Sequence, residues 1–203
     1  SWIDLLGLKT GDRIWVAGST HEGEDAIILK TFKRLRDYFP ELRLIIAPRR
    51  VERAGEILGL CRHHGLRAVR RTDLNLESCP WQVLILNTIG ELERMYGLAD
   101  VSFVGGSMVP VGGHNLLEPA RFGCPVLFGV YTHNFVQMAR LLVEAGGGRR
   151  VRDGEELFSR MKGLLLDSDR IHGMARGAKL FAEKNRGSLD RIMENIGGYF
   201  ESS

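Results

Sequence analysis

Short apolar runs alternate along the chain with stretches in which apolar residues recur at helical spacing. These runs predict buried strands at residues 13–17, 42–47, 68–69, 83–86, 101–104 and 125–128. After the first run, Ile28, Phe32, Leu35 and Phe39 fall on one face of a helix that Pro40 ends. Strands that alternate with helices predict an α/β fold, a Rossmann-like doubly wound parallel sheet with helices on both faces.

The strand signal ends at residue 153. Asp153 and Glu156 have the spacing of a capping box, and further helices are expected to begin at Ser168 and Ser188. No internal repeat or low-complexity linker divides the sequence. We therefore predict one α/β domain over residues 1–203, with a helical C-terminal tail.

Composition narrows the class of protein. Hydrophobic residues make up 44% and charged residues 26% of the chain, ordinary proportions for a soluble globular protein. The 28 Lys and Arg residues against 25 Asp and Glu give a net charge of +3, too close to balance to indicate a nucleic-acid partner. No apolar run approaches the roughly 18 residues that span a bilayer, and no signal peptide is visible. The chain has three Cys residues and no CxxC pair, which indicates a reducing, cytosolic compartment.

Ligands of doubly wound sheets bind at the carboxyl ends of the strands, near the point where the strand order reverses. The residues directly after each predicted strand are therefore the candidates for a site. Pro48 and Arg49 follow the second strand, where an Arg side chain suits a phosphate or a carboxylate. A solvated surface arginine is the alternative interpretation.

A glycine-rich loop follows the strand at residues 101–104. Gly106, Ser107, Gly113 and His114 lie in it, and glycines allow backbone to approach a ligand closely. A helix is expected to begin near Asn115, and its free N–H groups can bind an anion.

Glu118 follows in the first turn of that helix, near the expected mouth of the binding site. A carboxylate at this position can accept hydrogen bonds from both hydroxyls of a ribose. The alternative for the whole segment is a glycine-rich loop followed by an ordinary helix cap.

Two other strand ends carry weaker candidates. Small and hydroxyl residues around Ser19 can bind an anion, but the acidic residues that follow at 22, 24 and 25 oppose a phosphate and favour an N-cap interpretation. After the strand at 83–86, the backbone of Ile89, Gly90 and Glu91 can bracket a base, although an ordinary helix start explains the same residues.

Two further patterns bear on metals and membranes. Asp167 and Asp169 have the DxD spacing of metal-dependent sugar-nucleotide enzymes, but they lie between two helices, so we interpret them as a helix cap and expect no metal site. Residues 43–71 contain eight Arg against Glu52 and Glu56. This basic segment fits either an anionic membrane surface or a solvated face.

Six segments, in this order, resemble the C-terminal half of the 3-deoxy-D-manno-octulosonic acid (Kdo) transferases of Gram-negative bacteria. They are GSTHEGED from Gly18, APR from Ala47, NTIGEL from Asn87, FVGGS from Phe103, GGHNLLEPA from Gly112, and the pair Asn134-Phe135. GGHNLLEPA after FVGGS is the most specific of them. Arg50 departs from the family pattern, which usually has His there, and we expect it to face solvent or the membrane.

The resemblance implies the C-terminal half of a type-B (GT-B) glycosyltransferase. Such an enzyme transfers Kdo from CMP-Kdo to the lipid A precursor, lipid IVA, at the cytoplasmic face of the inner membrane, by inverting displacement without a metal or other cofactor. The resemblance also assigns the nucleotide to Pro48, Arg49, Ile89, Gly90, Glu91, Asn115, Leu116, Leu117 and Glu118. Candidate residues of a donor loop are Ser19, Gly106, Ser107, Gly113 and His114.

The same resemblance places the general base in an N-terminal acceptor domain, which this chain lacks. We therefore expect no catalytic residue here and no turnover by this soluble domain alone. The alternatives are a domain of a UDP-sugar-dependent GT-B transferase or epimerase, and a non-catalytic nucleotide-binding domain.

Overall fold

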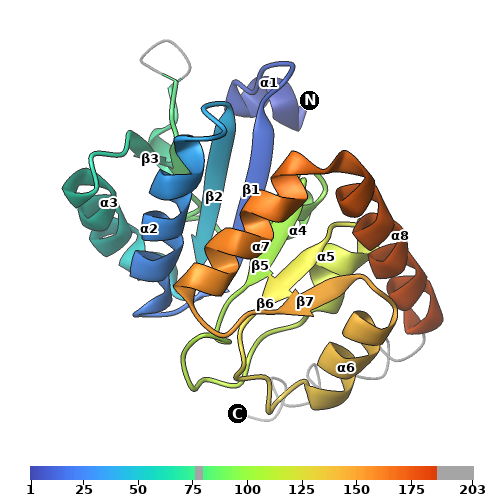
Figure 1. The fold of residues 1–203 in the computed structure, drawn as a ribbon. Coiled ribbons are helices and arrows are strands. Elements are labelled where there is room, and N and C mark those ends of the chain that lie inside the picture. Colours follow the sequence, from blue (N-terminus) through green and yellow to red (C-terminus); the bar gives the residue numbers. More distant parts are fainter. Residues whose placement is uncertain (76–79, 187–203) are drawn as a thin grey trace.

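The computed structural model describes residues 1–75 and 80–186, which form a seven-stranded parallel sheet covered by helices (Figure 1). The strands are β1 (Arg13–Thr20), β2 (Leu42–Pro48), β3 (Ala68–Arg70), β4 (Val83–Ile85), β5 (Val101–Val104), β6 (Val126–Phe128) and β7 (Gly148–Arg150). The helices are α1 (Trp2–Leu6), α2 (Glu24–Arg36), α3 (Ala54–His63), α4 (Leu92–Tyr96), α5 (Leu117–Arg121), α6 (Val136–Glu144), α7 (Gly154–Leu166) and α8 (Ser168–Lys184), with 3₁₀ turns η1 (Val51–Arg53) and η2 (Arg71–Asp73).

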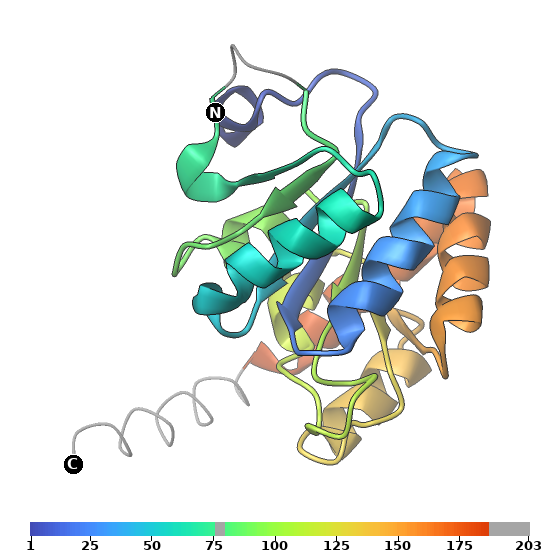
Figure 2. The same ribbon diagram turned by 90° about the vertical axis from the view of Figure 1, so that its left-hand side faces the viewer.

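The sheet is buried on both faces because successive side chains of a strand point in opposite directions. In β1, Trp15 and Ala17 pack toward α2, α3 and α7, whereas Ile14 and Val16 pack toward α1 and α4. Helices α2 and α7 lie side by side over the first face in both views (Figures 1 and 2). Helices α5, α6 and α8 enclose the other face at β5 and β6. Each large apolar side chain buried in these layers contributes roughly 1.5–3 kcal/mol.

The order of the strands locates the edge of the sheet at which a ligand is expected to bind. The order is β3-β4-β2-β1-β5-β6-β7, so β1 lies between β2 on one side and β5 on the other. The chain builds outward from β1 through β2 and then returns to the opposite side with β5. This reversal is the topological switch point, where doubly wound sheets bind ligands beyond the carboxyl ends of their strands.

The predicted fold class is confirmed, while several boundaries differ. Strand β1 continues through Thr20 instead of ending at residue 17, because Gly18 pairs with both Ala47 and Val104 and a bulge follows at Ser19. Helix α2 ends at Arg36, one turn before Phe39. The helix expected to begin at Ser188 lies outside the described residues.

Two short elements were not predicted. Helix α1 has only five residues, too few for a periodic signal, and is held by a capping box between Ser1 and Asp4. Strand β7 is an edge strand with two exposed arginines, so it lacks an apolar run. A Cβ atom on Gly148 would approach Leu142 Cδ2 to 2.8 Å, which shows how closely α6 packs on this strand.

Candidate nucleotide-binding cleft

Two adjoining cavities lie at the carboxyl edge of the sheet, beside the switch point. Their volumes are about 600 and 950 Å³, and both are lined by Gly90, Leu92 and Glu118, so we treat them as one cleft. The smaller cavity is also lined by Ser19, Ala47, Pro48, Arg49, Arg50, Val51, Glu52, Leu86, Thr88 and Ile89. The larger one is also lined by Glu93, Asn115, Arg121, Phe122, Lys179, Ala182, Glu183 and Arg186. The loops that follow strands β1, β2, β4 and β5 thus contribute to one site, together with the end of α8.

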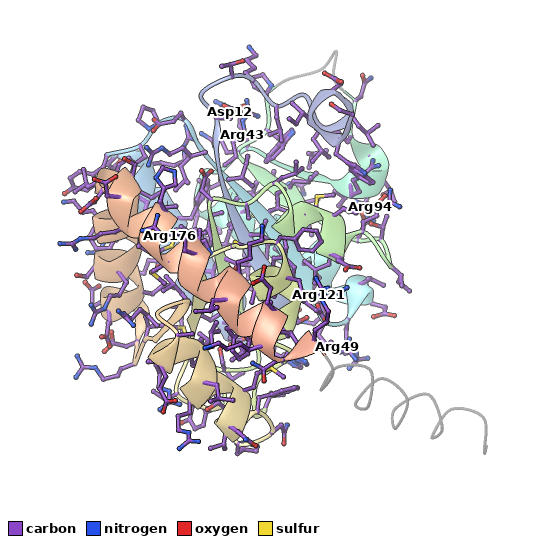
Figure 3. The ribbon with its side chains drawn as sticks, turned by 90° about the vertical axis from the view of Figure 1, so that its right-hand side faces the viewer. Asp12, Arg43, Arg49, Arg94, Arg121 and Arg176 are labelled. Carbon is purple, nitrogen blue, oxygen red and sulfur yellow. The ribbon has the colours of Figure 1, made fainter. Side chains whose placement is uncertain are left out.

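Glu118 lies where the two cavities meet. It lies in the first turn of α5, and burial together with the neighbouring Glu93 raises the pKa of its carboxyl group above the usual value. Arg49 and Arg121 partly offset this rise, and Figure 3 shows both guanidinium groups at the same edge of the molecule. The cleft therefore has a carboxylate at its centre between two cationic side chains.

The exit from β2 fixes the direction of Arg49. Its backbone N–H donates a hydrogen bond to the carbonyl of Thr20 at 2.9 Å, which ties the loop after β2 to the end of β1. The guanidinium group itself is exposed and forms no ion pair with a described residue. Arg50 is exposed, as the sequence predicts, and it lines the same cavity. Both arginines are therefore available to an anion in the cleft.

The loop after β4 presents backbone and an apolar side chain to the cleft. Ile89 is 88% exposed, and Gly90 has a φ of 83°, a left-handed conformation that favours glycine. Glu91 lines neither cavity. Its carboxylate accepts a hydrogen bond from the Thr88 hydroxyl at 2.6 Å and forms an ion pair with Arg71 at 3.1 Å. The Glu91 side chain therefore holds this loop in place.

The glycine-rich loop, residues 105–115, is held by a buried carboxylate. Glu24, fully buried in the first turn of α2, accepts hydrogen bonds from the backbone N–H groups of Gly106, Ser107 and Met108 at 2.7, 3.0 and 2.9 Å. The same carboxylate accepts the N–H of His21 at 2.9 Å. Four charge-assisted hydrogen bonds thus fix the loop after β5 against the loop after β1.

The next acidic residue is also structural. Asp25, fully buried, accepts a hydrogen bond from the Thr20 hydroxyl at 2.6 Å and forms an ion pair with Arg53 at 2.6 Å. The N-cap of α2 is Gly23, which makes no side-chain capping bond. The predicted N-cap role of the hydroxyl residues is therefore wrong, although Glu24 and Asp25 do occupy the first helical turn.

A histidine pair bridges the same two loops. The Nε2 atoms of His21 and His114 lie 2.7 Å apart, and the two rings are stacked with 5.0 Å between centroids and 6° between planes. Burial, then His21 and Arg49, lower the pKa of His114 to about 4. His114 is therefore neutral at pH 7, and one shared proton joins the two rings.

The structure separates the predicted donor-loop residues into two groups. Ser19 lines the cleft in a left-handed conformation with φ of 55°, which is uncommon outside glycine and often marks functional sites. Ser107 is buried, and its hydroxyl donates to the carbonyl of Val104 and accepts the N–H of Gly129. Its side chain is thus occupied by the fold. Gly113 is buried as well, with its N–H donated to the carbonyl of Gly106 at 2.7 Å.

Helix α5 begins two residues later than predicted. Leu116 and Leu117 are only 2% and 1% exposed, so their side chains belong to the core and only their backbone can reach a ligand. The Asn115 side chain accepts the N–H of Leu117 at 3.0 Å. One of the N–H groups expected to bind an anion therefore already has a partner.

Among the residues of the site that were not chosen from the sequence are His21, Glu24 and Arg121. Glu24 carried a usable signal, because it is in phase with Ile28 and Phe32 on the buried face of the helix. His21 and Arg121 carried no comparable signal, since what marks them is proximity to residues far away in the chain.

The other patterns noted in the sequence are structural. Asp167 caps α8 by accepting the N–H groups of Asp169 and Arg170, which confirms its interpretation as a helix cap. Within residues 1–75 and 80–186, no group of three His, Cys, Asp or Glu side chains is placed to hold a metal ion. No helix of the described residues is long and apolar enough to cross a membrane.

Half of the arginines in the basic segment, residues 43–71, are paired with carboxylates: Arg43, Arg53, Arg70 and Arg71.

This seven-stranded architecture, with its cleft at the switch point, is that of the C-terminal Rossmann-like domains of GT-B glycosyltransferases. HepE from Anabaena, solved with UDP-glucose, shares the fold at 16% identity, with a TM-score of 0.68 over 97% of this chain and 51% of that one. No protein-family model matches the chain.

Comparison with curated proteins identifies the family. The chain is 38% identical to the 3-deoxy-D-manno-octulosonic acid transferase of Haemophilus influenzae over 93% of its own length, and 35% identical to that of Aquifex aeolicus over 78%. It spans 44% of each of these relatives. The C-terminal CMP-Kdo binding domain of WaaA from Acinetobacter baumannii is 26% identical, with a TM-score of 0.77 over 84% of this chain and 89% of that domain. The chain is therefore a relative of the Kdo transferases, as its motifs indicated, and corresponds to less than half of their length.

Proposed function

We propose that this chain binds CMP-Kdo in the cleft and presents it for Kdo transfer, as the donor-binding domain of a longer GT-B glycosyltransferase. The observation that carries the proposal is the shared cleft of Arg49 and Glu118 in a relative of a CMP-Kdo binding domain. One side chain suits a phosphate and the other suits sugar hydroxyls.

Each part of the nucleotide has a matching group in the cleft. The exposed backbone of Ile89 and Gly90 brackets the base, Glu118 accepts the ribose hydroxyls, and Arg49 pairs with the phosphate. CMP-Kdo carries a single phosphate, whose charge one guanidinium group can balance. A diphosphate of a UDP-sugar would bring a second phosphate group into the same space.

The proposed reaction is an inverting, metal-independent displacement in which CMP leaves from the sugar. Negative charge develops on the departing phosphate, and Arg49 is placed to stabilise it. The general base that activates the acceptor hydroxyl belongs to an N-terminal acceptor domain. This chain therefore binds and orients the donor, and we expect it to be inactive alone.

The acceptor in this proposal is the lipid A precursor, lipid IVA, at the cytoplasmic face of the inner membrane. Arg49 and Arg50 are exposed, form no ion pair with a described residue, and lie at the rim of the cleft, where they would approach an anionic bilayer surface. The paired arginines of the basic segment contribute little net charge to such a contact.

Calorimetry with CMP, UDP and cytidine tests the proposal. We expect CMP to bind with a dissociation constant at least about tenfold lower than that of either UDP or cytidine, because the cleft fits one phosphate beside a cytosine nucleoside. Tighter binding of UDP would favour a UDP-sugar transferase or epimerase. Binding of no nucleotide would favour an interaction domain without a donor site.

A further inference from the structure

The proposed donor carries two acidic groups, and the function proposed above assigns a partner to only one of them. Arg49 is placed for the phosphate, whereas Kdo is a sugar acid with a carboxylate beside its anomeric carbon. Arg50 and Arg121 are exposed at the rim, and Glu118 repels an anion. The carboxylate therefore still lacks an assigned partner on the sugar side of Arg49.

The histidine pair, His21 and His114, lies beside that side of the cleft. Neither ring lines the two cavities, but Ser19 and Asn115, from the same two loops, do. Strands β1 and β5 are neighbours in the sheet, so the two loops that carry the rings meet at the switch point itself. Arg49 is linked to the same place, because its N–H is bonded to the carbonyl of Thr20, directly before His21. Along the edge of the sheet, the order is thus the loop after β4, then Arg49, then the histidine pair.

The pair is held in a fixed geometry. Both rings rest on Gly106, where a Cβ atom would come within 3.0 Å of His114 Cδ2 and 3.4 Å of His21 Cδ2. Glu24 fixes the backbone of both His21 and Gly106. The rings are therefore preorganised, and a ligand need not order them.

The mutual hydrogen bond limits the charge of the pair. One proton lies between the two Nε2 atoms, so the pair is either neutral, with one proton on one Nδ1 atom, or singly charged, with a proton on each Nδ1 atom. Neither Nδ1 atom forms a hydrogen bond with a residue in the described part of the chain. The singly charged pair can therefore donate to an anion from Nδ1.

Burial, together with the surrounding charges, favours the neutral form of His114 until an anion arrives. Arg49, after β2, opposes a further positive charge, and the buried carboxylate of Glu24, on α2, is already bound by four N–H groups. His133, in the loop after β6, lies against Gly112 of the glycine-rich loop. A carboxylate beside the rings reverses the balance, because a nearby negative charge favours the protonated imidazole.

We propose that the histidine pair binds the carboxylate of the sugar acid and takes up a proton from solvent as it does so. The proposal rests on the function proposed above. It predicts that CMP-Kdo binding is coupled to proton uptake near pH 7, whereas CMP binding is not, because CMP lacks the carboxylate. It also predicts that affinity for CMP-Kdo, relative to CMP, decreases as the pH rises.

Calorimetry at one pH, in two buffers of different ionisation enthalpy, measures the protons taken up with each ligand. We expect net uptake with CMP-Kdo, up to about one proton per site, and little with CMP. His21→Asn and His114→Asn should weaken CMP-Kdo binding about tenfold while changing CMP binding less than about twofold. His133→Asn is the matched control and should leave both affinities unchanged.

Two outcomes would overturn the inference alone. One is equal proton uptake with CMP and CMP-Kdo in the parent protein, a readout that needs no variant to fold. The other is an equal loss of affinity for both ligands in the histidine variants, which would show that the pair is a structural bridge between the two loops. A parent protein that binds neither ligand would instead remove the proposed function, and this inference with it.

Discussion

The hydroxyl oxygen of Ser107 accepts the backbone N–H of Gly129 at 2.8 Å, and the same hydroxyl donates to the carbonyl of Val104 at 2.6 Å. One buried side chain thus joins the loops that follow β5 and β6. Gly129 packs so closely on the backbone of Ser107 that no side chain fits at this position. The floor of the glycine-rich loop is therefore continuous with the neighbouring loop.

Because of this contact, a substitution of Ser107 can distinguish a structural role of the hydroxyl from a role in ligand binding. Ser107→Ala leaves the buried N–H of Gly129 without its partner, and we expect a loss of roughly 1–3 kcal/mol in the free energy of unfolding. CMP affinity at a temperature where the variant is folded should stay within about twofold of the parent, since the hydroxyl faces the fold. Urea unfolding and calorimetry measure the two quantities. A large loss of CMP affinity with unchanged stability would instead show that the Ser107 hydroxyl contacts the donor.

Glu24→Gln should weaken the glycine-rich loop. The amide keeps one accepting oxygen and adds two donors where four N–H groups converge, so we expect the variant to lose about 2–3 kcal/mol of unfolding free energy. Glu22→Gln is the matched control, because Glu22 is exposed two residues away and should change stability by less than about 0.5 kcal/mol. Equal effects of the two changes would mean that the four hydrogen bonds add nothing beyond the charge of this turn.

Arg49→Ala should reduce affinity for CMP far more than for cytidine. A guanidinium group forms paired, charge-assisted bonds with phosphate oxygens, and cytidine has no phosphate. Calorimetry with both ligands, at low and moderate salt, separates the two effects.

Arg50→Ala is the comparison for Arg49. It lines the same cavity but does not have a backbone bond to Thr20, so we expect a smaller loss of CMP affinity. A larger loss in Arg50→Ala would show that the neighbouring arginine holds the phosphate. Equal losses of CMP and cytidine in Arg49→Ala would indicate a structural role.

Glu118→Gln should weaken nucleoside binding by about 1.5–3 kcal/mol, as expected for hydrogen bonds to a charged group. Calorimetry with cytidine and 2′,3′-dideoxycytidine tests the ribose contact without a phosphate. The parent should prefer cytidine, and the variant should lose most of that preference. A variant that still discriminates fully would exclude Glu118 as the ribose partner.

The raised pKa of Glu118 gives this contact a pH dependence. Protonation removes accepting capacity, so cytidine affinity should be complete well above the raised pKa and should fall as the pH decreases through it. Glu118→Gln, which cannot titrate, should show no such decrease. Cytidine is the suitable ligand because it does not engage the anion sites. A parent protein with flat affinity from pH 7 to about pH 4.5 would contradict the assignment.

The sequence predicted the parts of the molecule that depend on local pattern. Buried runs located strands β1 to β6, and the rule for carboxyl ends brought Arg49 and Glu118 into one cleft. Strand β7 was not predicted because an exposed edge strand has no apolar run. What could not be predicted was long-range pairing: His114 meets a ring 93 residues earlier in the chain.

The direction of the side chains after the glycine-rich loop was also beyond the sequence pattern. Asn115 turns its side chain back onto the helix, and Leu116 and Leu117 enter the core, so three residues assigned to the nucleotide have most of their polar groups or side chains occupied by the fold. A linear motif identifies which segment approaches the ligand. It does not identify which atoms of that segment remain free.

The hydrogen bonds between Glu24 and the glycine-rich loop also imply an order of events in folding. The bonds from Glu24 to residues 106–108 join positions 82 to 84 apart in the chain, so they close only after α2 has docked and β5 has paired with β1. Their amide hydrogens gain protection from exchange at that late stage. A nascent chain therefore pairs β5 with β1 before residues 106–108 are fixed, and a polypeptide that lacks α2 would lose these three hydrogen bonds from the glycine-rich loop.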